Sequence, residues 1–254
     1  MATDHLLLLG QYEEVARRLG TKDSARVQCA NEATPLRESV VAHMCLGRFT
    51  EASAMADGMV SKFTREVSWD YMYAGTIRWF QRRRPTAVAI WKSGLTCGYT
   101  FYRGLDCALL LWYASTRSKS FPADAFIERV SNPYFKALRE GYFVDAIVRY
   151  IRDEIDEAEA RRLARSLASW EHFNAANIAQ LDFYIAAKAG ARGNRHLFQK
   201  HMAACAAAEG MDHIIPELWI ARYEAGMLPF QFPKGEYKAA GHPTKKVRRR
   251  RIES

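Results

Sequence analysis

The stretch that decides the fold is LRESVVAHMCLGRFTEASAMADGMVSKFT, residues 36–64, which is typical of two helices joined by a tight turn. Leu36, Val40 and Met44 recur every four residues, so they share one face of the first helix. Gly47 supplies the turn, and a second helix follows it. A helix pair of this kind cannot bury its apolar faces alone, so we expect it to stack on similar pairs.

Related turns divide the rest of the chain at nearly constant spacing. Residues 10–15 repeat the plan of residues 47–52, which is glycine, an aromatic residue, an acidic residue and a small apolar residue, and the two turns lie 37 residues apart. Later breaks fall at intervals of 35 to 38 residues, and no strand-like alternation competes with them. The spacing therefore predicts an all-α fold, an α-solenoid of about six stacked helical hairpins followed by a terminal helix.

The predicted domain covers residues 1–229, because the last periodic helix is stopped by Gly226 and Pro229. Residues 230–254 carry proline, glycine and charge without apolar periodicity, so we expect a basic, largely disordered tail. The formal net charge is +9, but residues 234–254 hold eight Lys/Arg against two Asp/Glu and so contribute +6 of it. The basicity belongs to the tail rather than to the domain.

Composition places the chain among ordinary globular proteins, with 254 residues, 49% of them hydrophobic and 26% charged. No apolar run approaches the roughly 18 to 20 residues of a membrane span, and residues 6–9 are too short for a signal-peptide core. We expect a cytoplasmic protein without a membrane partner. The five scattered cysteines indicate reduced packing residues rather than a disulfide framework.

Motifs for catalysis, metals and cofactors are missing from the sequence. The seven histidines show no metal-binding spacing, since His196 and His201 lie five residues apart, and Cys97 and Cys107 lack a second pair. The acidic run at residues 153–159 is typical of a helix N-terminus, where negative charge is favourable. We therefore expect no catalytic residues, no metal and no cofactor, although catalytic groups that meet only in space stay open.

Several repeats resemble those of tetratricopeptide proteins, in a degenerate and slightly lengthened form. The resemblance rests on Gly10-x-Tyr12, Gly47-x-Phe49-x-x-Ala52, Tyr71-x-x-x-Gly75 and Ala87-x-x-x-Trp91-x-x-Gly94. It implies a scaffold that holds a protein or peptide along a concave groove. Phe198 stands where the family has a small residue, so a regular superhelix is not expected there.

Four other segments resemble degenerate helical-repeat proteins of bacteria, a group that includes immunity proteins paired with secreted toxins. They are residues 89–95, 109–114, 182–186 and 217–224. This second resemblance implies an immunity protein that neutralises a toxin by direct stoichiometric binding.

In the repeat register, the first helix of each pair lines the groove and presents aromatic and arginine side chains, which are enriched in protein interfaces. The candidate partner-binding residues are Trp69, Met72, Trp79, Tyr113, Arg117, Tyr142, Asp145, Arg149 and Arg152. An aromatic stripe at helical spacing also fits a core, so both interpretations stay open for Trp69, Trp79 and Tyr142. A mixed aromatic and basic groove suits an acidic toxin or effector.

The tail supports an alternative, a helical-repeat protein that associates with nucleic acid. Its cationic residues are Lys245, Lys246, Arg248, Arg249, Arg250 and Arg251. Such a run can neutralise phosphates with steep salt dependence, although it also fits a solvated tail without a ligand. The sequence thus favours a protein-binding scaffold, with nucleic-acid association as the second interpretation.

Overall fold

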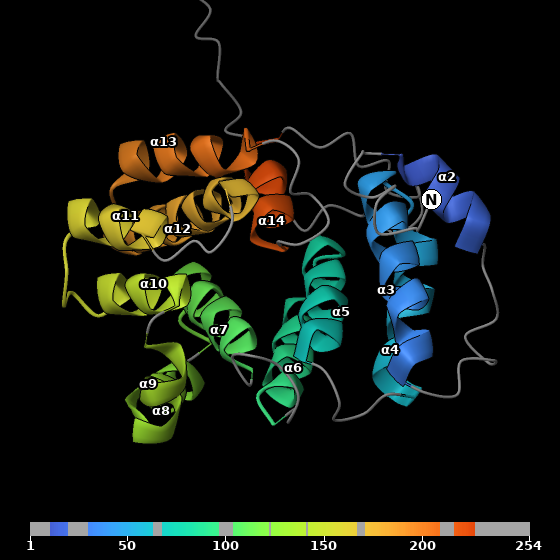
Figure 1. Ribbon diagram of the computed structural model, residues 1–254, viewed down its shortest axis with the longest axis horizontal. Coiled ribbons are helices and arrows are strands. Elements are labelled where there is room, and N and C mark those ends of the chain that lie inside the picture. The colour runs from blue at the N-terminus through green and yellow to red at the C-terminus, as the bar shows by residue number, and fades with distance from the viewer. Residues whose placement is uncertain are drawn as a thin grey trace, which may run out of the picture.

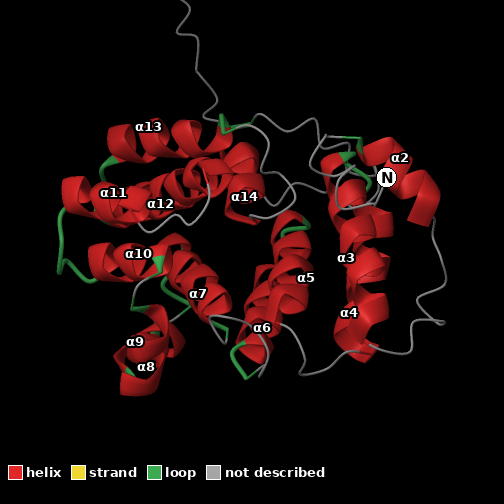
Figure 2. Cartoon of the chain, in the orientation of Figure 1, coloured by secondary structure: helices red, strands yellow, loops and turns green. Residues whose placement is uncertain are grey.

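A computed structural model describes residues 11–19, 30–62, 68–96, 104–121, 123–140, 142–166, 171–208 and 216–226. All regular elements in these ranges are helices, which confirms the all-α class (Figures 1 and 2). Among them, no helix combines the length and the apolar character that crossing a membrane requires. The predicted turn at Gly10 and the cationic run of the tail lie outside the described residues.

The helices follow one another along the chain with short connections. In order they are α2 (Tyr12–Leu19), α3 (Ala30–Cys45), α4 (Phe49–Lys62), α5 (Ser68–Phe80), α6 (Arg84–Gly94), α7 (Leu105–Arg117), α8 (Asp124–Ser131), α9 (Pro133–Arg139), α10 (Phe143–Ile151), α11 (Glu157–Ser166), α12 (Glu171–Ala191), α13 (Arg195–Ala206) and α14 (Pro216–Glu224). Consecutive helices pack as pairs: α3 with α4, α5 with α6, α7 with α8, α10 with α11, and α12 with α13. The predicted breaks from Gly47 onward fall between the helices of these pairs.

Four of the connecting turns share one backbone geometry. Each has a residue in the left-handed region, and the next residue donates its N–H to the carbonyl five positions back, as in a Schellman motif. The left-handed residues are Gly47 (φ 71°), Arg82 (φ 59°), Asp153 (φ 60°) and Gly193 (φ 76°). The hydrogen bonds are Arg48 to His43 (2.8 Å), Arg83 to Arg78 (2.9 Å), Glu154 to Arg149 (2.9 Å) and Asn194 to Ala189 (2.9 Å). Four of the five helix pairs, all except α7–α8, are therefore joined by the same kind of turn.

The α5–α6 pair packs closely because Gly75 leaves room for Trp91. A Cβ atom at Gly75 would lie 2.3 Å from Nε1 of Trp91, which is closer than real Cβ contacts. The buried indole donates its N–H to the carbonyl of Met72 at 3.2 Å. Gly75 and Trp91, which suggested a repeat unit in the sequence, are thus in contact across the α5–α6 pair.

A run of buried aromatic rings connects α5 and α6 with α7 and α12. Trp79 lies 5.5 Å from the ring centroids of both Trp91 and Tyr113, and Tyr113 lies 4.7 Å from that of Phe183. These rings come from α5, α6, α7 and α12. Aromatic pairs at such distances add to the stability that burial of their surface supplies.

Helix α14 returns to the middle of the molecule and packs against α5, α12 and α13. Figure 1 shows it between α12 on one side and α5 on the other. The Tyr113 hydroxyl donates to Glu224 at 3.0 Å, and the rings of Tyr73 and Trp219 lie 5.6 Å apart. Repeats of a regular solenoid touch only their neighbours. The contacts of α14 with α5 therefore depart from that regular pattern.

Candidate functional site

Three of the residues expected to face a groove lie in the core. Trp79 is 1% exposed and Tyr113 is 0% exposed, and Met72 is also buried. The expectation that they face outward is wrong, because α5 and α7 are covered by α6, α12 and α14 as well as by each other. For Trp79, the core interpretation of the aromatic stripe is the right one.

The other predicted partner-binding residues reach the surface to different degrees. Trp69 and Tyr142 are exposed, and Arg149 is half-buried. Three of the four charged ones form ion pairs within the chain, since Arg117 pairs with Glu224 at 3.1 Å, Asp145 with Arg139 at 2.8 Å and Arg152 with Glu154 at 2.8 Å. These residues come from α5, α7 and the α10 region, where the backbone N–H of Asp145 donates to the carbonyl of Tyr142 at 3.0 Å.

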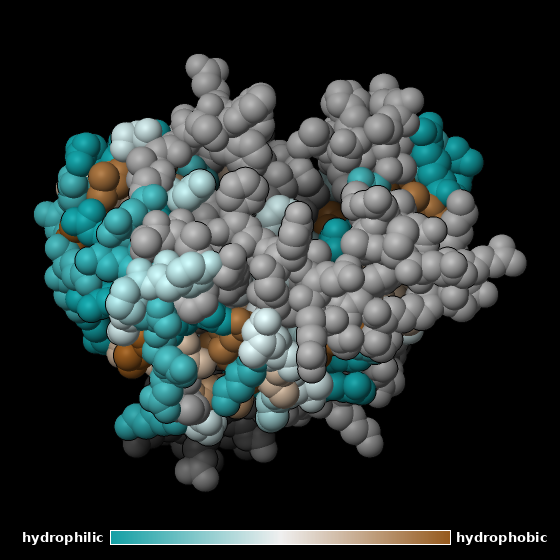
Figure 3. All heavy atoms as spheres, turned by 60° about the horizontal axis from the view of Figure 1, so that its bottom comes forward, coloured by the Kyte–Doolittle hydropathy of each residue, from teal (hydrophilic) through white to brown (hydrophobic). Residues whose placement is uncertain are grey.

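Three exposed large apolar or aromatic side chains occur along α8, α9 and the residue before α10. Ile127 is 54% exposed, Tyr134 is 47% exposed and Tyr142 is 39% exposed. We call these three residues the α8–α10 patch. Figure 3 brings the bottom of Figure 1, where α8 and α9 lie, toward the viewer and shows hydrophobic side chains among hydrophilic ones on that side. Exposed charged residues of the same region are Asp124, Glu128 and Lys136 on the helices and Glu140 just after α9.

The sequence interpretation missed Ile127 and Tyr134. A signal for Ile127 was present, because Phe126 and Val130 are four residues apart and form the buried face of α8. A residue next to Phe126 then points away from that face. Because α8 has only 8 residues, its apolar periodicity spans a single interval, from Phe126 to Val130.

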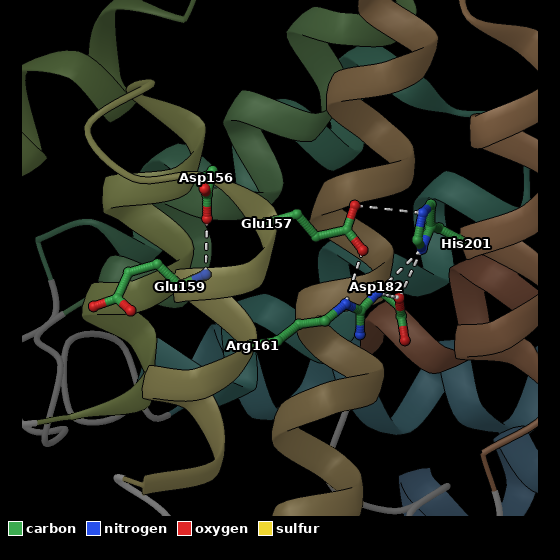
Figure 4. Close-up of polar contacts among 6 residues, drawn as sticks. All are labelled: Asp156, Glu157, Glu159, Arg161, Asp182 and His201. Carbon is green, nitrogen blue, oxygen red and sulfur yellow. Dashed lines mark hydrogen bonds and ion pairs between the residues drawn. The ribbon is translucent and has the colours of Figure 1, made fainter.

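Charged side chains of α11, α12 and α13 form a second feature, which we call the paired cluster (Figure 4). It consists of Glu157, Arg161, Asp182 and His201. The Arg161 guanidinium donates to Glu157 at 2.8 Å and to Asp182 at 2.5 Å. His201 lies with Nδ1 2.8 Å from Asp182 Oδ1 and with Nε2 3.8 Å from Glu157 Oε2.

The chemistry of the paired cluster indicates a tie between helices. An ionised carboxylate can only accept, so Nδ1 of His201 donates to Asp182. An aspartate that orients a histidine in this way also occurs in catalytic triads. Here the imidazole is 3% exposed and its other nitrogen faces Glu157, so the ring is not presented to a substrate. Within the described ranges, no three His, Cys, Asp or Glu residues are placed to hold a metal ion.

The neighbouring acidic residues of α11 behave as expected for a helix N-terminus. Asp156 Oδ1 accepts from the backbone N–H of Glu159 at 2.8 Å, which caps the helix. The hydrogen bond from Arg162 lowers the pKa of Glu159. Hydrogen bonds from Lys188 and then Arg192 likewise lower the pKa of Asp153. Glu157 was not singled out from its neighbours, because its partner His201 is 44 residues away in the chain.

Two buried carboxyl groups have a different environment. Glu217 of α14 is 0% exposed and accepts at Oε1 from Gln180 Nε2 at 2.8 Å and from the Tyr184 hydroxyl at 2.7 Å. Asp106 of α7 is 7% exposed and hydrogen-bonds to the Trp69 indole. Neither Oε2 of Glu217 nor Oδ2 of Asp106 has a hydrogen-bond partner in the part of the chain that the structure describes. We call the region of Asp106, Gln180, Tyr184 and Glu217 the α14 joint.

Burial raises the pKa of Asp106 to about 7, and the charge of Glu217 raises it as well. Burial also raises the pKa of Glu217, against the hydrogen bonds from Gln180 and Tyr184, which lower it. The joint therefore combines two carboxyl groups that disfavour each other's ionisation.

No known protein family, no curated protein and no solved structure matches this chain.

Proposed function

We propose that this protein is a protein-binding helical scaffold that contacts its partner through the α8–α10 patch. The observation that carries the proposal is the exposure of Ile127 on α8, Tyr134 on α9 and Tyr142 immediately before α10. Aromatic and large aliphatic side chains that are exposed together commonly anchor protein interfaces. A binding role, rather than a catalytic one, also agrees with the paired cluster, whose histidine is enclosed by carboxylates.

For the architecture, we propose a tetratricopeptide-like solenoid of about six helical hairpins within residues 1–229, whose terminal helix α14 folds back. The repeated left-handed turns and the close approach of Gly75 and Trp91 support this arrangement. The contacts of α14 with α5 imply a closed array rather than an open rod.

The narrower candidate is a cytoplasmic immunity protein that neutralises a bacterial toxin by stoichiometric binding. It rests on the segments that resemble such proteins. The partner would be an acidic toxin or effector domain if Arg149 and Arg152 contribute, since Arg152 is exposed beside α10. Replacing both residues by glutamate should then weaken the complex, and an unchanged affinity would remove the acidic partner from the proposal.

The test of the patch begins with affinity purification of the partner from the source cell, followed by titration calorimetry with the purified partner. Ile127→Asp combined with Tyr134→Ser should weaken a one-to-one complex by more than about tenfold, equivalent to about 1.4 kcal/mol. The matched control, Ala89→Asp combined with Ala203→Ser, changes exposed residues of α6 and α13 and should bind as the wild type does. Equal affinity of the patch variant and the wild type would contradict the proposal.

The second candidate function is association with nucleic acid through the tail. The observation that favours it is the eight Lys/Arg against two Asp/Glu in residues 234–254. Deleting residues 241–254 should abolish nucleic-acid binding, which should fall steeply with salt in the full chain. Protein-partner binding should persist in the deletion variant, and loss of both activities would contradict the division of roles between domain and tail.

A further inference from the structure

We propose that Asp106 and Glu217 make the seating of α14 depend on a proton, so that α14 packs against α5 and α12 while the joint is protonated and loosens when both carboxyls ionise. This switch goes beyond the proposed binding function and does not depend on it. It rests on the position of the two carboxyl groups inside the joint, on their burial and on the atoms that face them.

Glu217 lies in the first turn of α14, and its side chain is fully buried. Its Oε1 accepts two hydrogen bonds, from Gln180 and Tyr184 of α12, whereas its Oε2 has no partner in the described residues. An ionised carboxylate in this place would carry a charge on an oxygen that no donor reaches. Burial of such a charge is strongly unfavourable, and a bound proton removes it.

Asp106 of α7 is the second carboxyl group of the joint that is buried with an oxygen lacking a hydrogen-bond partner in the described chain. Its carboxyl is nearly buried, with a hydrogen bond to Trp69 and with Oδ2 unpartnered in the described chain. Because the charge of Glu217 disfavours the charge of Asp106, the pair binds a proton more readily than either residue would alone.

The surrounding groups supply little positive charge to the joint. On α3 and α5, Arg37 is held by Asp70 at 2.5 Å, and on α14 Arg222 donates to the carbonyls of Ala206 and Ala208 at 3.1 Å. The other titratable groups that interact with one or both of the carboxyls are Tyr73 of α5, Tyr184 of α12 and Cys205 of α13. Burial raises the pKa of Tyr73, Tyr184 and Cys205, so these three stay neutral.

The position of Glu217 in its helix opposes the switch, in addition to the hydrogen bonds from Gln180 and Tyr184. Negative charge in the first turn of a helix is favourable, and Glu217 occupies that turn of α14. The dipole effect is smaller than the cost of burying an unpaired charge, so burial dominates. Ionisation therefore loosens α14, beginning at its N-terminal end, where Glu217 lies.

The direction of the pH dependence follows from the raised pKa values. A carboxyl group that binds its proton more tightly in the folded chain stabilises docking fully below its ordinary pKa. The stabilisation is lost as the pH rises through the folded value, which is about 7 for Asp106. Opening of α14 should therefore become easier between acidic and neutral pH.

The experiment is hydrogen exchange of the full-length protein at pH 5.5 and pH 7.5, with rates corrected for the intrinsic pH dependence of exchange. The protection of the α14 amides should fall by about tenfold or more relative to that of α10, which lies outside the joint. In the double variant Asp106→Asn with Glu217→Gln, which mimics the protonated state, this fall should be absent. Asp124→Asn, a change at an exposed carboxylate of α8, is the control and should retain the fall.

Either of two results would overturn the proposal. One is equal protection of α14 in the wild type at both pH values, and the other is an undiminished fall in the double variant. If the double variant does not fold, Asp106→Asn alone is measured, and it should reduce the fall. The wild-type measurement tests the proposal without any substitution.

Discussion

The paired cluster and the α14 joint both include side chains of helix α12, but the buried carboxyl groups in the two regions have different partners. Asp182 in the paired cluster meets Arg161 and His201, whereas Gln180 and Tyr184 at the joint offer only neutral donors to Glu217. Both regions fix α12 to its neighbours. At the joint, where the partners of Glu217 are neutral donors, burial is the main cause that raises the pKa of both Asp106 and Glu217.

The pKa of a carboxyl group shifts in opposite directions when its partners are charged and when it is buried among neutral groups. Hydrogen bonds from Lys188 and Arg192 lower the pKa of the exposed Asp153, while burial raises the pKa of Asp106 and Glu217. Carboxylates with a lowered pKa stabilise the fold above their ordinary value and cease to do so in acid. Those of the joint stabilise it in acid and cease to do so toward neutral pH.

The largest effect is expected when the paired cluster loses its central carboxylate. Asp182→Ala leaves the guanidinium of Arg161 and the imidazole of His201 without their shared partner, so it should lower the free energy of unfolding by about 3 kcal/mol. Urea denaturation at pH 7 measures this. The control Glu159→Ala removes an exposed ion pair with Arg162 and should change little. Equal losses in the two variants would show that the cluster does not tie the helices together.

A smaller effect of opposite sign is expected at the joint. Asp106→Asn removes a carboxyl group that must hold a proton or carry a buried charge at neutral pH, so it should raise the free energy of unfolding at pH 7.5 by about 2 kcal/mol. At pH 5 the gain should shrink, because the wild-type residue then takes up its proton at less cost. Thermal or urea denaturation at the two pH values measures the difference, and a destabilised variant at pH 7.5 would contradict the assignment.

The smallest effect is expected when Tyr184 of α12 loses its hydrogen bond to Glu217. Tyr184→Phe removes one donor to Glu217 and should cost about 1 kcal/mol, with the larger loss at pH 7.5, where the carboxylate needs that donor more. The matched control is Tyr113→Phe, which removes a hydroxyl bonded to Glu224, where Arg117 supplies a positive charge. Its cost should not increase from pH 5 to pH 7.5, and the same trend in both variants would remove the distinction.

Much of the fold could be predicted because the turns leave a local signal. Gly47 and residues 190–194 contain the glycines that a left-handed turn favours, and Gly75 and Trp91 marked a helix pair. Arg82 and Asp153 adopt the same left-handed geometry without glycine, so those turns were indicated by spacing and, near Arg82, by Pro85. The return of α14 to α5 could not be predicted, because a contact between distant segments leaves no local periodicity.

The candidate sites were harder to predict than the fold. Trp79 and Tyr113 have the residue types of an interface, but the neighbouring helices cover them, and sequence alone does not show which helices cover a face. The paired cluster joins three helices and the joint draws on α7, α12 and α14, so their members carry no common motif. The candidate roles of Arg149 and Arg152 and of the tail stay predictions.

Infrared spectroscopy tests most directly whether the α14 joint holds a proton. At pH 6, exposed carboxylates are ionised, so a carbonyl stretch of a protonated carboxylic acid reports a buried, protonated group. The account predicts this band in the wild type and its loss in the Asp106→Asn, Glu217→Gln double variant. A wild-type spectrum without the band, or a band that the double variant retains, would contradict it.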